Sequence, residues 1–171
     1  KQVDMVEKNY LDIISAKTAS LFGASMRVGG CINNRSKKEK EALDSFGRNL
    51  GICFQITDDI LDYSSKEKVF GKKIGNDFLE GKITLPIILL FQKSNKIERQ
   101  MLNKFFTQNS RNQDDFQKIV GLIDKHKIIE ICKKRADYFS NVAADSLSIF
   151  EKNFTIEKLQ ELSFYIVNRL N

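Results

Sequence analysis

The sequence has no tryptophan, one proline and one histidine among its 171 residues. So little proline, together with only nine glycines, leaves few of the turns that hairpins and short strands need. A single histidine, His126, excludes a metal site built on two histidines, and we interpret it as a surface residue beside Lys125 and Lys127. The composition therefore favours an all-α protein whose polar chemistry depends on other side chains.

Disulfide and membrane signals are also missing. The three cysteines, Cys31, Cys53 and Cys132, are odd in number and far apart. Each lies in an apolar stretch, which predicts reduced core residues and argues against a disulfide framework or a zinc site. The longest apolar run, Leu85–Phe91, is much shorter than the ~20 residues that span a bilayer. We therefore expect a cytoplasmic protein without a transmembrane segment.

The charge is moderate and evenly spread. A formal net charge of +6 comes from lysines distributed over most of the chain, which is typical of solvated helix faces and does not predict nucleic-acid binding. Hydrophobic residues make up 42% of the sequence, enough for a real core in a chain of this length.

Helical spacing of apolar residues organises most of the chain. Residues 4–30 carry Leu11, Ile14, Leu21 and Val28 along one expected helix face. The polar segment 33–40 breaks this pattern, and 64–82 reads as a loop rich in glycine and lysine. The further helices that we expect cover residues 41–63, 85–92 (with Pro86 in the first turn), 96–107, 114–123, 126–150 and 155–169. Without repeats or linkers, residues 1–171 are expected to belong to one domain.

The stretch FQITDDILDY, residues 54–63, places acidic residues in an otherwise apolar helix. Gln55, Asp58, Asp59 and Asp62 are spaced i, i+3, i+4 and i+7, so they project from one side of the helix. One interpretation is that this side simply faces water. However, three like charges within two turns repel one another, and they do so more strongly when partly buried. A partner with positive charge is therefore expected.

Grouped carboxylates suit hard divalent cations, and Mg²⁺ in particular is held by one or two carboxylates while phosphate oxygens and water fill its other positions. An EF-hand is excluded because the aspartates lie on a helix. Lysines that could meet a phosphate are Lys17, which precedes Thr18 on the first helix, and Lys72 and Lys82 in the loop. Lys17 could equally be a snorkelling side chain, and the loop could be a solvated connection.

These pieces occur in an order that resembles a known family. KTASLF (17–22), GICFQITDDILDY (51–63) and FGKKIGNDFLEGKITLPII (70–88) resemble the C-terminal half of the trans-isoprenyl diphosphate synthases, the polyprenyl synthetase family. The closing LQELSFYIVNRLN is similar to the end of its medium- and long-chain bacterial members, such as the octaprenyl diphosphate synthases.

The resemblance implies an all-α bundle around a central cavity, the isoprenoid synthase type I fold, in a homodimer. It implies condensation of an allylic diphosphate with isopentenyl diphosphate, assisted by Mg²⁺. It assigns metal binding to Asp58, Asp59 and Asp62, with Asp77 in support of the metal's water shell. It assigns diphosphate binding to Lys17 and Lys72, with Lys82 bracing the loop over the site, and the reacting end of the substrate to Lys17, Thr18 and Gln55.

The family's first aspartate-rich motif and its isopentenyl diphosphate site are not found in this sequence, which begins with Lys rather than Met. We therefore expect the C-terminal part of a single polyprenyl synthetase domain, incomplete as an isolated catalyst. The alternative is a truncated or accessory non-catalytic subunit that pairs with a complete prenyl synthase. A terpene cyclase is disfavoured because cyclases usually carry a second metal motif with Asn, Ser and Glu.

Overall fold

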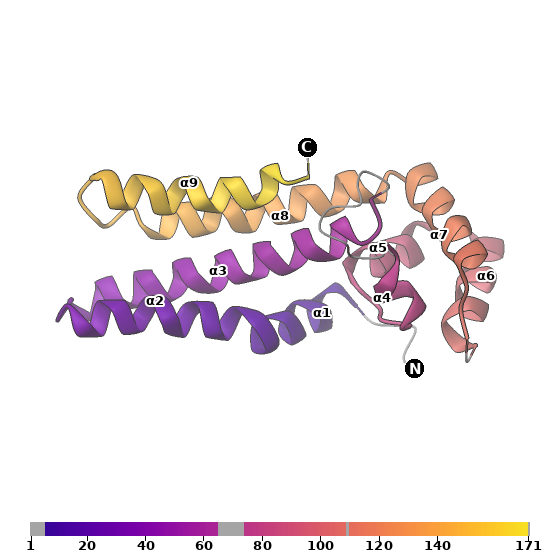
Figure 1. Ribbon diagram of the computed structural model, residues 1–171, viewed down its shortest axis with the longest axis horizontal. Coiled ribbons are helices and arrows are strands. Elements are labelled where there is room, and N and C mark those ends of the chain that lie inside the picture. The colour runs from indigo at the N-terminus through magenta and orange to yellow at the C-terminus, as the bar shows by residue number, and fades with distance from the viewer. Residues whose placement is uncertain (1–5, 65–73, 109, 171) are drawn as a thin grey trace. The chain divides into compact units, whose positions relative to one another are not determined.

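The computed structural model describes residues 6–64, 74–108 and 110–170, and within these ranges it contains helices and no strand. The all-α prediction is therefore confirmed. The helices are α1 (Glu7–Ile14), η1 (Ser15–Ala19, a π-helical turn), α2 (Ser20–Ile32), α3 (Lys37–Leu61), α4 (Asn76–Leu79), α5 (Leu85–Lys93), α6 (Lys96–Thr107), α7 (Gln113–Lys125), α8 (Ile128–Ser146) and α9 (Phe154–Asn168) (Figure 1).

The described residues fall into two compact units. The acidic unit takes its residues from Lys1–Tyr10 and Asp58–Cys132, and the bundle unit from Leu11–Thr57 and Lys133–Asn171. The end of α3 belongs to the acidic unit and the rest of that helix to the bundle unit. The expectation of a single domain stays a prediction.

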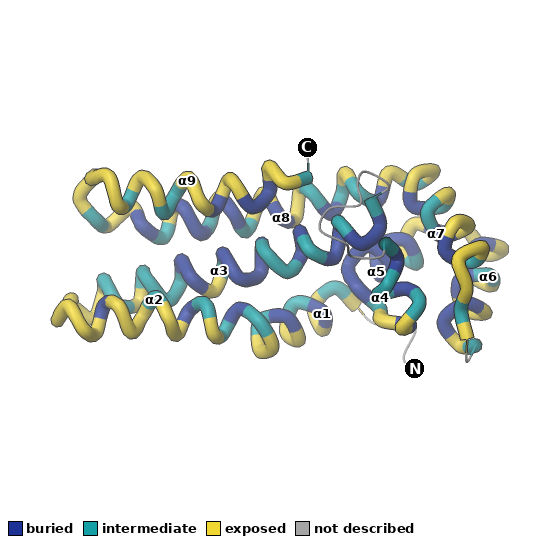
Figure 2. The backbone as a smooth tube through the Cα atoms, in the orientation of Figure 1, coloured by how far each residue is buried: buried dark blue, intermediate teal, exposed yellow. Residues whose placement is uncertain are grey.

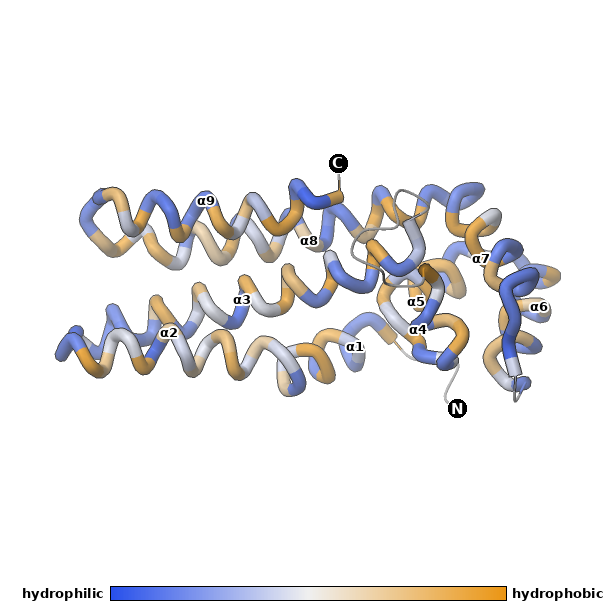
Figure 3. Tube along the Cα trace, in the orientation of Figure 1, coloured by the Kyte–Doolittle hydropathy of each residue, from blue (hydrophilic) through white to orange (hydrophobic). Residues whose placement is uncertain are grey.

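Long helices build the bundle unit. α2 lies beside α3, and α8 lies beside α9 (Figure 1). The hydroxyls of Ser45 and Ser146 join α3 to α8 at 2.9 Å, and the amide of Gln160 on α9 donates to the carbonyl of Ala144 on α8 at 3.1 Å. Orange and blue residues alternate along these helices in Figure 3, as expected for amphipathic helices that pack on one face.

Small residues let α2 and the preceding turn approach α3 closely. A β-carbon on Gly51 would lie 2.7 Å from the Cα of Ala19, and one on Gly47 would collide with the carbonyl of Phe22. Both obstacles are backbone or backbone-linked atoms that cannot swing aside. The pair of glycines therefore sets the separation of the two helices.

We predict that Gly51→Ala destabilises the protein by about 1–3 kcal/mol, because overpacking forces the backbone of two helices apart. Gly29→Ala on α2 is the matched control, since nothing lies within 4 Å of its added β-carbon. That variant should be neutral or stabilising by up to about 1 kcal/mol, as alanine favours helix over glycine. Chemical denaturation measures both, and equal effects would contradict this account of the contact.

The acidic unit has an aromatic core beside the apolar helix α5. Residues Leu85–Leu90 of α5 are all buried, and this part of the helix is dark blue in Figure 2. Phe78 of α4 packs edge-on against Phe106 with ring centroids 5.6 Å apart, and its ring is tilted against that of Phe116 at 6.0 Å. The predicted start of this helix, with Pro86 in its first turn, is confirmed.

A buried glutamate joins the start of α6 to the end of α7. Asn95 and Glu98 form a reciprocal capping box at the N-terminus of α6. Glu98 also accepts from Lys125 Nζ at 2.7 Å and contacts His126 Nε2 at 3.0 Å. The Lys125 ammonium, followed by the Asn95 backbone, lowers the pKa of Glu98 to about 2. The interpretation of His126 as an ordinary surface residue is therefore wrong, because its ring is mostly covered.

We predict that Glu98→Gln lowers the melting temperature at neutral pH. A carboxyl whose folded pKa is depressed stabilises the fold above its unfolded pKa, and this contribution is lost as pH falls through the folded pKa. The difference between the two proteins should therefore shrink between pH 4.5 and about 2. Glu130→Gln, an exposed change on α8, is the control. A difference that persists at the acid end would refute the ionic origin.

Several boundaries differ from the predictions. α3 begins at Lys37 rather than Glu41, because Ser36 and Glu39 cap the helix start. The Ser36 N–H donates to the Glu39 carboxylate at 2.8 Å, and the Glu39 N–H donates to the Ser36 hydroxyl at 3.3 Å. α4 interrupts the predicted loop 64–82, and α8 ends at Ser146 rather than residue 150. Cys53 and Cys132 are buried as predicted, whereas Cys31 is exposed. Among the described helices, none combines the length and apolar character needed to cross a membrane.

Candidate active site

The acidic stretch at the end of α3 is buried. Asp58 is half-buried, whereas Asp59 and Asp62 are each only 4% exposed. Asp62 directly follows α3, and its N–H donates to the carbonyl of Asp58 at 3.3 Å, which continues the helical turn. The interpretation that these carboxylates simply face water is therefore wrong for Asp59 and Asp62.

Each buried carboxylate has a neutral donor. The Tyr10 hydroxyl of α1 donates to Asp59 Oδ2 at 2.7 Å, and the backbone N–H of Asp77 donates to Asp62 Oδ2 at 2.9 Å. Burial, followed by the negative charge of Asp59, raises the pKa of Tyr10, so the hydroxyl keeps its proton and acts as the donor. Sequence reasoning missed Tyr10, because nothing in the local pattern links it to a carboxylate 49 residues away.

A glycine starts the segment that carries Asp77. Gly75 has a φ of +83°, a left-handed conformation that glycine adopts without strain, and its N–H donates to the carbonyl of Asp62 at 3.0 Å. A β-carbon there would lie 2.7 Å from the Phe116 ring. Gly75 therefore brings α4, and with it the Asp77 amide, against the acidic stretch.

Lys82 closes the same segment. Its ammonium lies 2.9 Å from Asp77 Oδ1 and 2.7 Å from Glu80 Oε2, and these two partners, Glu80 first, raise the pKa of Lys82. Its backbone N–H also donates to the carbonyl of Asp77 at 2.8 Å. These contacts tie the two ends of the segment 77–82 together.

Lys17 and Thr18 lie in the π-helical turn Ser15–Ala19 of the bundle unit. Such turns contain one residue more than an α-helical turn and occur often at functional sites. Buried residues run Ile14, Ala19, Gly23 and Gly30, a step of five followed by steps of four and seven. The predicted face was wrong here: Leu21 and Val28 are 70% and 54% exposed, because the inserted residue rotates the following helix.

The turn presents Thr18 to α3. The Thr18 hydroxyl donates to Gln55 Oε1 at 2.9 Å, one helical turn after the close contact of Gly51 with Ala19. Thr18 is half-buried, and Lys17 is exposed rather than directed into the core. The structure therefore brings together two of the predicted residues, Thr18 and Gln55. Lys72 lies outside the described residues.

The donors suit a hard cation. In the part of the chain that the structure describes, no group of three or more His, Cys, Asp or Glu side chains is arranged to hold a metal ion. Mg²⁺ commonly needs only one or two carboxylates when a substrate phosphate supplies further oxygens. The half-buried Asp58 beside the restrained Asp59 and Asp62 fits that mode.

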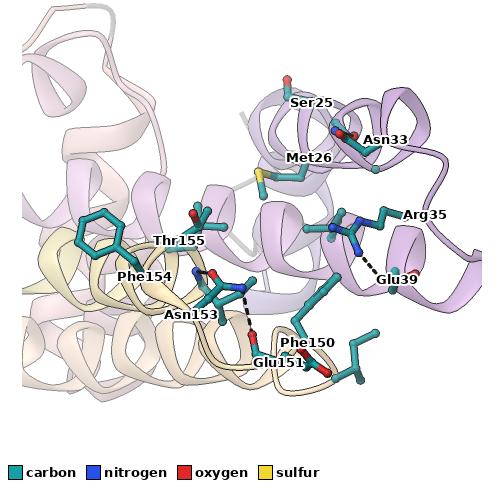
Figure 4. A pocket seen from close by; sticks show the side chains of 16 residues that line it. Ser25, Met26, Asn33, Arg35, Glu39, Phe150, Glu151, Asn153, Phe154 and Thr155 are labelled. Carbon is teal, nitrogen blue, oxygen red and sulfur yellow. Dashed lines mark hydrogen bonds and ion pairs between the residues drawn. The ribbon is translucent and has the colours of Figure 1, made fainter.

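A pocket of about 950 Å³ in the bundle unit lies elsewhere. It is lined by residues around the α2–α3 turn, including Met26, Arg35 and Glu39, and by residues between α8 and α9, including Phe150 and Phe154 (Figure 4). None of the predicted site residues lines it.

The fold is shared with solved structures of polyprenyl diphosphate synthases. The structure superposes on a polyprenyl synthase from Caulobacter crescentus, solved with calcium and isoprenyl diphosphate, with a TM-score of 0.93 and 33% identity, covering 98% of this chain and 51% of that one. A decaprenyl diphosphate synthase from Rhodobacter capsulatus gives a TM-score of 0.92 at 32% identity, over 99% and 52% of the two chains. The protein thus has the all-α type I isoprenoid synthase fold.

The sequence comparison agrees. The profile of the polyprenyl synthetase family matches residues 1–123. An octaprenyl diphosphate synthase from Haemophilus influenzae is 28% identical over 163 residues, which cover 95% of this chain and 49% of that enzyme. A geranylgeranyl diphosphate synthase from Sulfolobus acidocaldarius is 34% identical over 147 residues, 86% of this chain and 44% of the relative. The chain belongs to the polyprenyl synthetase family, and it spans about half the length of these relatives.

We predict that Lys82→Met destabilises the protein by no more than about 1 kcal/mol, because the Lys82 side chain is 50% exposed and exposed ion pairs contribute little. Amide hydrogen exchange should nevertheless become faster within residues 75–82, and added salt should reduce the difference from the unsubstituted protein. Lys37→Met, whose side chain is 90% exposed at 3.9 Å from Glu41, serves as the control. Unchanged exchange in the segment would contradict a bracing role for Lys82.

Proposed function

We propose that the polypeptide carrying this chain is a trans-prenyltransferase that condenses an allylic diphosphate with isopentenyl diphosphate to form a polyprenyl diphosphate. Membership of the family supports the reaction class. The observation that carries the proposal is the acidic stretch, in which Asp59 and Asp62 are buried rather than exposed at the surface. A structural helix end has no need of three such residues in two turns.

Asp58, Asp59 and Asp62 would hold Mg²⁺, with Asp77 supporting its hydration. When bound, the metal neutralises the leaving diphosphate and so favours cleavage of the allylic carbon–oxygen bond. Asp58 is the direct ligand in this proposal, because it is the most accessible of the three carboxylates. A relative that was crystallised with calcium and isoprenyl diphosphate supports a divalent cation and a diphosphate ligand in this family.

Lysines would bind the diphosphate. Lys17 and Lys72 act as compact point charges toward phosphate oxygens. Lys82 contributes through the segment that it holds, since Asp77 and Glu80 already contact its ammonium. The exposure of Lys17 suits a side chain that must meet a substrate.

Oxygen atoms of Thr18 and Gln55 would stabilise positive charge at the reacting end of the allylic substrate. Their hydrogen bond restrains both side chains, which lowers the reorganisation needed during the reaction. No side chain acts as a nucleophile in this mechanism. Attack by isopentenyl diphosphate and loss of a proton complete the condensation, in a cytoplasmic homodimer.

We predict that Asp58→Ala slows Mg²⁺-dependent turnover of the allylic substrate at least about 100-fold, since removal of one electrostatic group at a reacting centre costs 10²–10³ in kcat. The assay uses the polypeptide that carries this chain, with radiolabelled isopentenyl diphosphate. Asp145→Ala, an exposed change on α8, should leave turnover unchanged. Undiminished turnover by Asp58→Ala would refute the site assignment, and no prenyl transfer by the unsubstituted polypeptide would refute the proposed function.

A further inference from the structure

A side-chain hydrogen bond from Tyr10 joins α1 to the acidic stretch within the acidic unit. Its hydroxyl lies 2.7 Å from Asp59 Oδ2, and the two residues are 3% and 4% exposed. A hydroxyl that donates to an ionised oxygen at this distance makes a short, charge-assisted hydrogen bond. Both partners are thus held where water has little access.

We infer that Tyr10 is a positioning residue for the cation site: its buried hydroxyl fixes the orientation of the Asp59 carboxylate while leaving the negative charge of that carboxylate intact. The inference rests on the proposed function, because it concerns the same carboxylates. It adds a residue from outside the aspartate-rich stretch to the group that determines cation affinity.

The chemistry of the donor supports this role. A lysine or arginine in the place of Tyr10 would also satisfy the buried carboxylate, but its positive charge would oppose the binding of a divalent cation. A phenol satisfies the oxygen with a neutral dipole. The backbone N–H of Asp77 does the same for Asp62 at 2.9 Å, so two buried carboxylates are restrained by neutral donors.

The rigidity of the donor supports it as well. The Tyr10 side chain has two rotatable bonds, and its ring is buried, so the hydroxyl has little freedom to follow a moving carboxylate. Tyr63 offers a contrast within the same unit: it is 2% exposed, yet its hydroxyl donates to no carboxylate among the described residues. Burial of a tyrosine near the acidic stretch therefore does not by itself produce a contact with a carboxylate.

The test compares Tyr10→Phe with Tyr63→Phe, since each removes one buried hydroxyl and keeps the ring. Calorimetric titration of the polypeptide that carries this chain with Mg²⁺, in the presence of inorganic pyrophosphate, measures cation affinity. Tyr10→Phe should weaken binding roughly 10-fold or more, the usual effect of removing a group that orients a metal ligand. Tyr63→Phe should change the affinity less than about twofold, and thermal unfolding without metal reports any stability loss separately.

A second variant shows whether Tyr10 acts through Asp59. If it does, Tyr10→Phe should weaken Mg²⁺ binding no further when Asp59→Asn is already present. Additive effects would overturn the inference. Affinity that is equal in Tyr10→Phe and the unsubstituted chain would also overturn it, while leaving the proposed function in place. No Mg²⁺–pyrophosphate binding by the unsubstituted polypeptide that carries this chain would overturn both.

Because this chain has no tryptophan, tyrosine absorption provides a second measurement on the same variants. Tyrosine dominates the near-ultraviolet absorption of this chain, so a cation bound beside Asp59 should alter the tyrosine difference spectrum. The alteration should persist in Tyr63→Phe and largely disappear in Tyr10→Phe. A spectrum unchanged by saturating Mg²⁺ and pyrophosphate in the unsubstituted chain would contradict contact between Tyr10 and the cation site.

Discussion

The acidic unit depends on burying carboxylates at the end of α3, among apolar side chains. A buried charge is strongly unfavourable unless hydrogen bonds replace the lost water, and Asp59 and Asp62 are both almost fully covered. The start of the chain supplies Tyr10 for one, and the turn at Gly75 supplies a backbone amide for the other. Elements distant in sequence are thus held together by the requirement to satisfy two oxygen atoms.

In the bundle unit the main constraint is different: two polar side chains must be held opposite each other between packed helices. Gly51 permits the backbone of α3 to approach Ala19, and one turn further along Gln55 accepts from Thr18. The π-helical turn makes this possible, because it delivers Thr18 to α3 while the helix around it stays continuous. Steric fit of the backbone therefore determines where the polar contact forms.

Apolar periodicity predicted most helices well, since burial of one face is what stabilises them. The start of α5 at Leu85 and the bounds of α6 at Lys96 and Thr107 follow from proline placement and spacing. The π-helical turn was not predicted, because periodicity assumes an unchanging 3.6-residue repeat and carries no sign of an inserted residue. The aspartates could be identified from their spacing in the sequence. The contact of Tyr10 could be identified only in the folded structure, because a contact across 49 residues leaves no local pattern in the sequence.

The π-helical turn also constrains the number of residues in this part of the protein, and not only their types. Deleting one residue from Ser15–Ala19 would restore a regular α-helix and rotate one side of it against the other by about 100°, the angle of one helical residue. A conservative substitution in the turn leaves the orientation of the following helix unchanged, whereas deletion of a single codon changes it. Among homologous sequences, gaps should therefore be excluded from these five positions more strictly than changes of residue type.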